Sequence, residues 1–116
     1  MEVFEGSLSG IPLLRIVGDV DHSGSSIFDD AVQRALALEK GRLFLDLSDC
    51  LYIDSGGLGA ILYALKGRQD RLWLGVIGPD ANILRLFTLV GLADDPSLQI
   101  FSSVDEARAY LGETGT

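Results

Sequence analysis

The stretch of sequence that decides the fold is residues 42–62, RLFLDLSDCLYIDSGGLGAIL. Its first part, Arg42–Leu47, is a nearly continuous apolar run, which is typical of a strand buried on both faces. Asp54–Gly57 is predicted to turn the chain into a helix, because apolar residues then recur at helical spacing: Leu58, Ile61, Leu62 and Leu65. A buried strand followed directly by a helix is the repeating unit of a parallel α/β sheet.

Elements on either side of this stretch fit the same unit. Upstream, Met1–Leu8 and Leu13–Val17 are predicted to be strands that pair antiparallel, because only a short turn at Ser9-Gly10 separates them. Pro12 indicates an edge strand or a strand start. The remaining predicted elements are a helix with a capping box at Ser26 and a stop at Gly41, a strand over Leu72–Ile77, a helix capped by Asp80 and ended by Gly91, a strand over Leu98–Phe101, and a helix with a capping box at Ser103.

This order predicts an α/β fold with a mostly parallel sheet, an antiparallel N-terminal strand and about four helices. Residues 1–112 are expected to form a single domain, followed by a small polar tail, residues 113–116, that frays. The helix residues expected to face inward include Ile27 and Phe28 in the first helix, Ile83, Leu84, Phe87 and Val90 in the third, and Ala107, Tyr110 and Leu111 in the last.

The composition excludes several classes of protein. The 116 residues are 47% hydrophobic and 22% charged, which excludes disorder and suits one globular domain. Nine Lys and Arg against seventeen Asp and Glu give a net charge of −8, so we expect neither nucleic-acid nor membrane binding, and a partner with a basic face fits better. An acidic N-terminus, the lack of a membrane-length apolar run and a single cysteine, Cys50, predict a cytoplasmic location.

Two loops are the candidate functional regions, because partners and ligands of parallel sheets meet the loops at the C-terminal strand ends. One contains Asp19, Asp21, His22 and Ser23, and the other is a glycine-rich turn with Asp54, Ser55, Gly56, Gly57 and Leu58. The turn could bind an anion at a helix N-terminus, or it could be a tight connection that needs glycine only for its dihedral angles.

Metal and enzymatic chemistry are the weaker interpretations of these loops. Five carboxylates at or near predicted strand ends could hold Mg²⁺, could form a solvated acidic rim or could be a set of turn caps: Asp19, Asp21, Asp46, Asp49 and Asp54. A hydrolase triad of Ser55, His22 and an aspartate lacks the G-x-S-x-G motif around its serine. We therefore expect no catalytic residue, no metal site and no cofactor, and we interpret Cys50 as a small core residue.

Short motifs are spread over nearly the whole chain. In order, they are Gly18-Asp19-Val20-Asp21, Leu45-Asp46-Leu47-Ser48 before Ile53-Asp54-Ser55, Gly57-Leu58-Gly59, Leu84-Arg85-Leu86-Phe87 before Val90-Gly91-Leu92, and Phe101-Ser102-Ser103-Val104-Asp105-Glu106-Ala107. Together they resemble the STAS domain family, which is named for sulphate transporters and anti-sigma factor antagonists. The small size and the Asp21-His22 pair are similar to the bacterial anti-sigma factor antagonists.

The resemblance implies a binding switch rather than an enzyme. It implies that the unphosphorylated protein docks, through the two loops named above, on an anti-sigma factor that is also its Ser/Thr kinase, and that docking frees the sigma factor. Phosphorylation before the second helix then ends docking. Other interpretations stay open: a nucleotide-binding STAS regulatory domain, a STAS subunit of a transporter or signalling complex, and, for the oligomeric state, a weak homodimer.

Gly56 departs from the family pattern, D-S-S/T-G-L-G, in which the second hydroxyl is usually the phosphorylated one. Ser55 stands at the first hydroxyl position and is the phosphorylation candidate, although a phosphate there would lie next to the carboxylate of Asp54. Either Ser55 has taken over the role, or the protein docks without this control. We expect Ser55 to be a poor kinase substrate.

Overall fold

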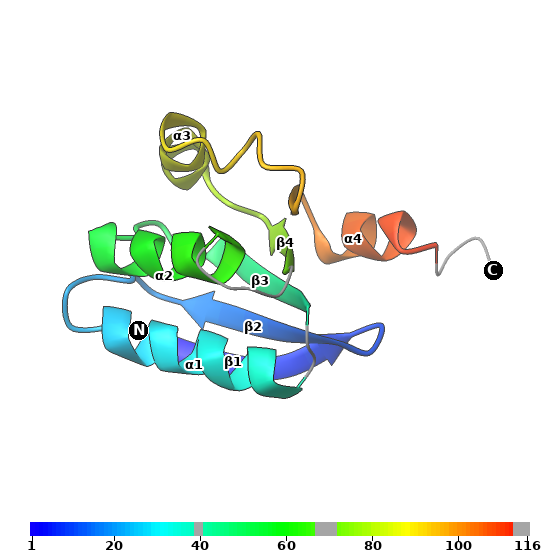
Figure 1. Cartoon of the computed structure of the whole chain (residues 1–116), viewed down its shortest axis with the longest axis horizontal. Helices are drawn as coiled ribbons and strands as arrows, with labels where there is room; N and C mark the ends of the chain where they lie inside the picture. The colour runs from blue at the N-terminus through cyan, green and yellow to red at the C-terminus, as the bar shows by residue number, and fades with distance from the viewer. Residues whose placement is uncertain (39–40, 67–71, 113–116) are drawn as a thin grey trace.

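The computed structural model describes residues 1–38, 41–66 and 72–112, and the tail expected at 113–116 lies outside the described residues. Strands and helices alternate after an initial hairpin (Figure 1). In chain order, the elements are β1 (Glu2–Leu8), β2 (Ile11–Val17), α1 (Ser25–Leu38), β3 (Arg42–Asp49), α2 (Ser55–Lys66), β4 (Trp73–Ile77), α3 (Ala81–Leu89), β5 (Leu98–Phe101) and α4 (Val104–Tyr110). That residues 1–112 form one domain stays a prediction.

The five strands form one mixed sheet in the order β1-β2-β3-β4-β5. β1 is antiparallel to β2, and each later neighbouring pair is parallel, which confirms the predicted fold class. Because β2 to β5 run in one direction, the loops that follow them all leave from the same edge of the sheet. No helix in the described ranges is both long and apolar enough to span a membrane.

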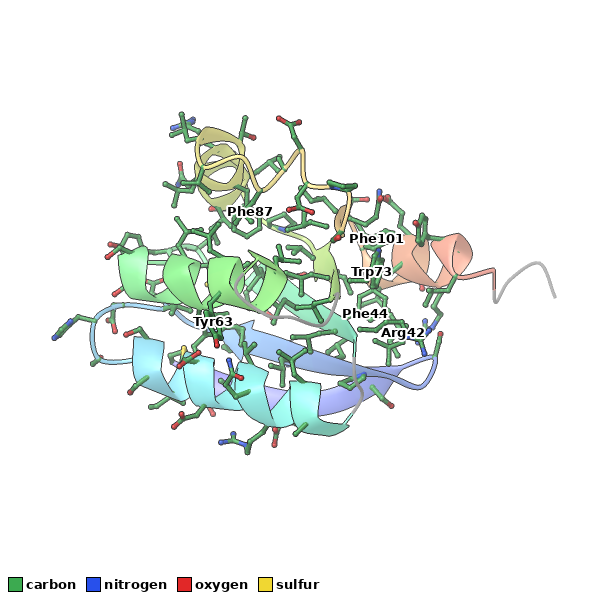
Figure 2. The ribbon with its side chains drawn as sticks, in the orientation of Figure 1. Arg42, Phe44, Tyr63, Trp73, Phe87 and Phe101 are labelled. Carbon is green, nitrogen blue, oxygen red and sulfur yellow. The ribbon has the colours of Figure 1, made fainter. Side chains whose placement is uncertain are left out.

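The core is divided between the two faces of the sheet. In β3, Leu43, Leu45 and Leu47 point to the face where α1, α2 and α3 add Phe28, Ile61 and Phe87. Phe44 alternates to the opposite face and packs with Phe101 and with Ala107 of α4. Figure 2 shows Phe44, Trp73 and Phe101 together beside α4, with Phe87 apart from them under α3. Each helix therefore contributes at least one buried residue to one of the two cores.

The predicted capping box at Ser26 is wrong, because α1 already begins at Ser25. The carboxylate of Asp21 instead accepts the backbone N–H groups of Ser23 and Gly24, at 3.1 and 3.2 Å, and so organises the turn before the helix. The other two predicted caps are confirmed. The backbone N–H of Ile83 donates to Asp80 at 3.0 Å, and that of Glu106 donates to Ser103 at 3.1 Å.

The predicted inward face of α3 is partly wrong. Ile83 and Phe87 are buried, but Leu84 and Val90 are exposed. Leu92, just beyond the helix, is fully buried in the core instead. The left-handed Gly91 (φ 80°) turns the chain back, and the N–H of Leu92 donates to the Phe87 carbonyl at 2.8 Å.

Two smaller expectations are wrong, and one that was left open is decided. Ile27 of α1 is exposed rather than inward. Tyr110 of α4 is 57% exposed, although its ring stacks on Trp73 with centroids 6.2 Å apart. Pro12 is the second residue of β2, which lies between β1 and β3, so the proline marks a strand start and not a sheet edge.

Candidate partner-binding site

The two candidate loops are joined at one edge of the sheet. Val20 and Ile53 form an isolated parallel bridge beyond the ends of β2 and β3. The N–H of Val20 donates to the Tyr52 carbonyl at 2.9 Å, and the N–H of Asp54 donates to the Val20 carbonyl at 2.8 Å. The loop after β2 and the turn before α2 are therefore held side by side, and the residues on them form one surface.

Asp21 fixes the shape of the first loop. Its Oδ1 accepts the hydroxyl of Ser23 at 2.8 Å in addition to the two backbone N–H groups. The hydrogen bond from Ser23 is the main reason that the pKa of the Asp21 carboxyl lies below its usual value, and the N–H groups of Gly24 and Ser23 lower it further. The side chains of Asp19, His22 and Ser23 are exposed around this turn.

Asp54 caps α2, which agrees with the interpretation of these carboxylates as turn caps. Its Oδ1 accepts the N–H of Gly57 at 2.8 Å. Gly57 itself is buried, and a Cβ atom there would lie 2.7 Å from Cγ1 of Val20 and 2.9 Å from Cγ2 of Ile53. Gly57 was expected on the partner-binding surface, but its burial makes it the residue that lets α2 approach the Val20–Ile53 bridge.

Ser55 and Gly56 are the exposed residues of the turn. Ser55 is the first residue of α2, and its hydroxyl makes no hydrogen bond within the described part of the chain. A Cβ atom on Gly56 would lie 3.1 Å from both Cβ and Oγ of Ser25. The position that the family resemblance assigns to the phosphorylated hydroxyl thus faces Ser25 at the start of α1. Asp54 and Leu58 are half-buried.

The carboxylates near the strand ends are engaged separately. Asp46 accepts the N–H and hydroxyl of Ser48 at 3.0 and 2.6 Å, and Asp49 accepts the guanidinium of Arg15 at 2.7 Å. Within residues 1–38, 41–66 and 72–112, no three potential metal ligands lie together. In the same ranges no hydrogen bond joins His22 to Ser55, so the described geometry offers no support for the hydrolase triad.

Cys50 lies beneath the site rather than in it. The side chain is fully buried, as the sequence interpretation expects, and its thiol donates to the Tyr52 carbonyl at 3.3 Å. Burial raises the pKa of the Cys50 thiol. A buried thiol with a raised pKa is a poor nucleophile, so Cys50 contributes packing to the β3–α2 connection.

Sequence reasoning missed the exposed apolar residues of this edge. Leu51 and Tyr52 are 64% and 51% exposed beside the bridge. The segment from Cys50 to Ile53 is apolar throughout, so the sequence alone does not show which of its side chains are buried. The bridge at Ile53 sets the orientation, in which Ile53 is buried and Leu51 and Tyr52 are exposed.

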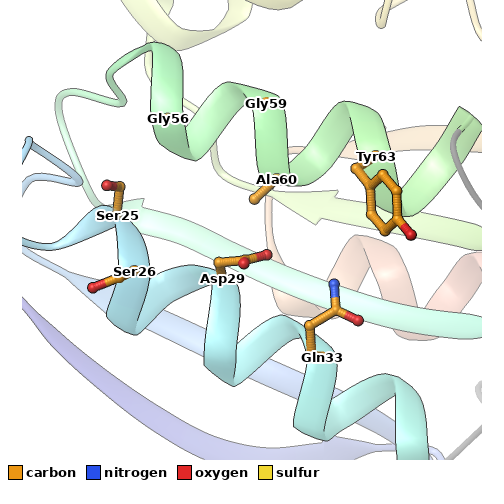
Figure 3. Close-up of a pocket in the computed structure, with 8 residues that line it drawn as sticks. All are labelled: Ser25, Ser26, Asp29, Gln33, Gly56, Gly59, Ala60 and Tyr63. Carbon is orange, nitrogen blue, oxygen red and sulfur yellow. The ribbon is translucent and has the colours of Figure 1, made fainter.

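The sequence analysis also did not predict the groove between α1 and α2. It has a volume of about 620 Å³ and opens next to the turn at Gly56 (Figure 3). A signal did exist in the sequence, because residues 25, 29 and 33 form a polar stripe at four-residue spacing on α1.

Comparisons with known proteins agree with this architecture. The family model described as "Mlab, STAS domain" matches residues 7–101. The anti-sigma-B factor antagonist of Listeria monocytogenes is 31% identical over 80 residues, which cover 68% of this chain and 70% of that protein.

Solved structures show the same fold. The crystal structure of an anti-sigma factor antagonist from Mycobacterium paratuberculosis has a TM-score of 0.78 at 19% identity, over 94% of this chain and 92% of that chain. The Bacillus cell fate determinant SpoIIAA in its phosphorylated form has a TM-score of 0.68 at 16% identity, over 95% and 99%.

The fold and the joined loops define an α/β module whose exposed loop surface lies at the C-terminal edge of its sheet. The chain belongs to the STAS domain family, and its similarity is to the anti-sigma factor antagonists within that family.

Proposed function

We propose that this protein is an anti-sigma factor antagonist, which binds an anti-sigma factor and thereby regulates sigma-factor-dependent transcription in the cytoplasm. It acts by binding and not by catalysis, and its partner is an anti-sigma factor of the Ser/Thr kinase type. The observation that carries the proposal is the Val20–Ile53 bridge, because it joins the two candidate loops into one surface. The relatives named as anti-sigma factor antagonists support it.

The chemistry of this surface suits a protein partner. Leu51 and Tyr52 supply exposed apolar side chains of the kind that anchor interfaces. Asp19, Asp21 and Ser23, on the loop that the bridge joins to this segment, add exposed acidic and hydroxyl groups. Such a surface fits a partner patch that combines an apolar pocket with basic residues, and it fits poorly to a polyanion.

The direct test is binding of the purified chain to an anti-sigma factor from the same genome, measured by calorimetry. His22→Ala is the test variant, since the imidazole is exposed and makes no hydrogen bond or ion pair within the described residues. We expect it to weaken binding several-fold with an unchanged melting temperature. Leu89→Ala, on the exposed side of α3, is the matched control and should bind like the wild type. Equal binding by the His22 variant and the control would contradict the assigned surface.

We further propose that Ser55 is a poor substrate for the partner kinase. The hydroxyl expected at position 56 is absent, and a phosphate on Ser55 would add about −1.5 to −2 charge next to Asp54. The test is incubation with the kinase and ATP, followed by intact mass measurement and peptide mapping. Gly56→Ser should restore phosphorylation. Rapid and stoichiometric modification of Ser55 in the wild type would show that Ser55 has taken over the switch.

Nucleotide binding is the alternative from a different functional class. The groove between α1 and α2 adjoins the glycine-rich turn, but its lining within the described residues includes one carboxylate and no Lys or Arg to pair with phosphates. We therefore expect no perturbation of the groove amides when ATP or GTP is titrated into the ¹⁵N-labelled protein.

A further inference from the structure

The groove between α1 and α2 is formed by two facing stripes of residues. From α1 come Ser25, Ser26, Asp29 and Gln33, and from α2 come Gly56, Gly59, Ala60 and Tyr63. Figure 3 shows Asp29 and Gln33 on the side of α1 that faces α2, with Tyr63 at the far end of the groove. The groove is continuous with the turn at Gly56, so it extends the candidate partner-binding site along the two helices.

Small residues on α2 keep the groove open. A Cβ atom added to Gly59 would meet nothing within 4 Å, so the space opposite Gly59 is free. A Cβ atom added to Gly56 would meet Ser25 at 3.1 Å, so the groove narrows at its loop end. The free space at Gly59 belongs to the same groove that Asp29 lines from α1.

Asp29 is the one charged residue among the described residues that line the groove. Its carboxylate is half-buried and has no hydrogen bond or ion pair within residues 1–38, 41–66 and 72–112. The nearest arginine along the helix, Arg34, instead pairs with Glu5 of β1 at 3.7 Å. An unpaired carboxylate that faces an open groove repels anions and attracts a cation.

The other lining groups suit a guanidinium ion better than an ammonium ion. The hydroxyls of Ser25 and Ser26 and the amide oxygen of Gln33 can accept several N–H donors, and the ring of Tyr63 offers a flat face. Arginine presents five donors in one plane and stacks on aromatic rings, whereas lysine presents a compact charge.

We propose that this groove receives an arginine side chain from the partner protein, with Asp29 as the counter-charge. The proposal rests on the proposed function, because the partner is the anti-sigma factor that docks on the adjoining loops. The net charge of −8 favours a basic partner surface, and the open side of the groove admits a side chain carried on a helix or loop.

The first test is independent of any anti-sigma factor. The probe is arginine blocked at both ends, by N-acetylation and C-terminal amidation, titrated into the ¹⁵N-labelled protein. Citrulline blocked in the same way has the same shape without the charge and serves as control. We expect the arginine probe alone to shift the backbone amides of Gly56, Gly59 and Ala60. Asp29→Asn should abolish the shift, and Asp30→Asn, on the adjacent exposed residue, should preserve it.

The second test uses the anti-sigma factor. Asp29→Asn should weaken binding about tenfold or more and reduce its salt dependence, while Asp30→Asn should bind within about twofold of the wild type. Both variants should keep a wild-type melting temperature.

Asp29→Asn binding like the wild type would overturn the groove proposal and leave the proposed function standing. A specific arginine shift in a protein that binds no anti-sigma factor would overturn the proposed function and leave the groove as a site for another basic partner. No arginine shift in the wild type would overturn the groove proposal.

Discussion

Replacement of two glycines in α2 by alanine should change stability in opposite directions. Gly57 and Gly59 lie two residues apart on the same helix, so Gly57→Ala and Gly59→Ala make the same chemical change. Their surroundings differ completely. Gly57 is buried against the Val20–Ile53 bridge, whereas Gly59 is exposed and faces the open groove.

The magnitudes follow from the space at each site. At Gly57 the new methyl group would lie 2.7 and 2.9 Å from methyl groups of Val20 and Ile53, both of which are buried. That is about 1 Å inside ordinary carbon–carbon contact. Because two buried side chains would have to move, we take the upper part of the range for overpacking, about 2–3 kcal/mol, and the better helix propensity of alanine returns at most about 1 kcal/mol. We expect a net loss of about 1–2 kcal/mol for Gly57→Ala and a gain of about 0.8–1.0 kcal/mol for Gly59→Ala.

The assay is urea denaturation followed by Trp73 fluorescence and far-UV circular dichroism. Trp73 is the single tryptophan and packs edge-on against Phe44, with ring centroids 5.3 Å apart, so its emission reports on the opposite core. Coincident transitions and equal m-values would show that stability alone has changed. A Gly57→Ala protein as stable as the wild type would refute the close packing of α2 on the bridge. A less stable Gly59→Ala protein would refute the open groove.

Three further measurements test other parts of the structure. Phe87→Ala should lower the free energy of unfolding by about 3–5 kcal/mol, whereas Leu89→Ala, at a side chain that is 74% exposed, should change it by less than about 0.5 kcal/mol. The Cys50 thiol, whose pKa burial raises, should react slowly with a thiol reagent in the folded protein and rapidly in urea; equal rates would contradict its burial. Because the pKa of Asp21 is lowered on folding, its contribution to stability is present at neutral pH and is lost as the pH falls through the folded-state pKa. Ser23→Ala should raise that pKa in an NMR titration, and Ser26→Ala should leave it unchanged.

The strands and their order along the chain could be predicted because their signals are local. The apolar run at Arg42–Leu47 and the turn at Ser9-Gly10 depend on neighbouring residues only. The turn is found as predicted, and the strand begins at Arg42 as predicted and runs on to Asp49. The inward face of α3 could not be predicted in the same way. Residues 83–89 of the helix, ILRLFTL, place apolar side chains on more than one side, so the periodicity does not decide which side faces the core. The phase is set by the turn at Gly91, which brings Leu92 into the core.

The candidate site shows the same division between local and tertiary signals. The two loops could be predicted from strand ends, because parallel strands bring their C-terminal loops to one edge. The separate roles of Gly56, Gly57 and Gly59 could not be predicted from the sequence, because each role depends on which residue the glycine faces in the folded protein. Gly57 faces the bridge, Gly56 faces Ser25, and Gly59 faces open space. The three glycines therefore have different roles: Gly57 allows close packing on the bridge, Gly56 lies where the groove is narrow, and Gly59 leaves space in the groove.

Gly56 connects the candidate switch with the groove. Position 56 lies at the narrow end of the same groove that Asp29 faces, and a side chain there would approach Ser25. The hydroxyl of Ser25 makes only a long hydrogen bond, 3.5 Å, to the carbonyl of His22 and can rotate away, whereas the Cβ of Ser25 would have to shift by a few tenths of an ångström. A phosphate on a hydroxyl at position 56 would compete with Asp29 for a cationic side chain of the partner. With glycine at position 56, no phosphorylated residue at that position can compete with the carboxylate of Asp29. On the proposed function, the strength of docking at the groove would depend on Asp29, and control would come from Ser55, from another site or from the amount of protein present.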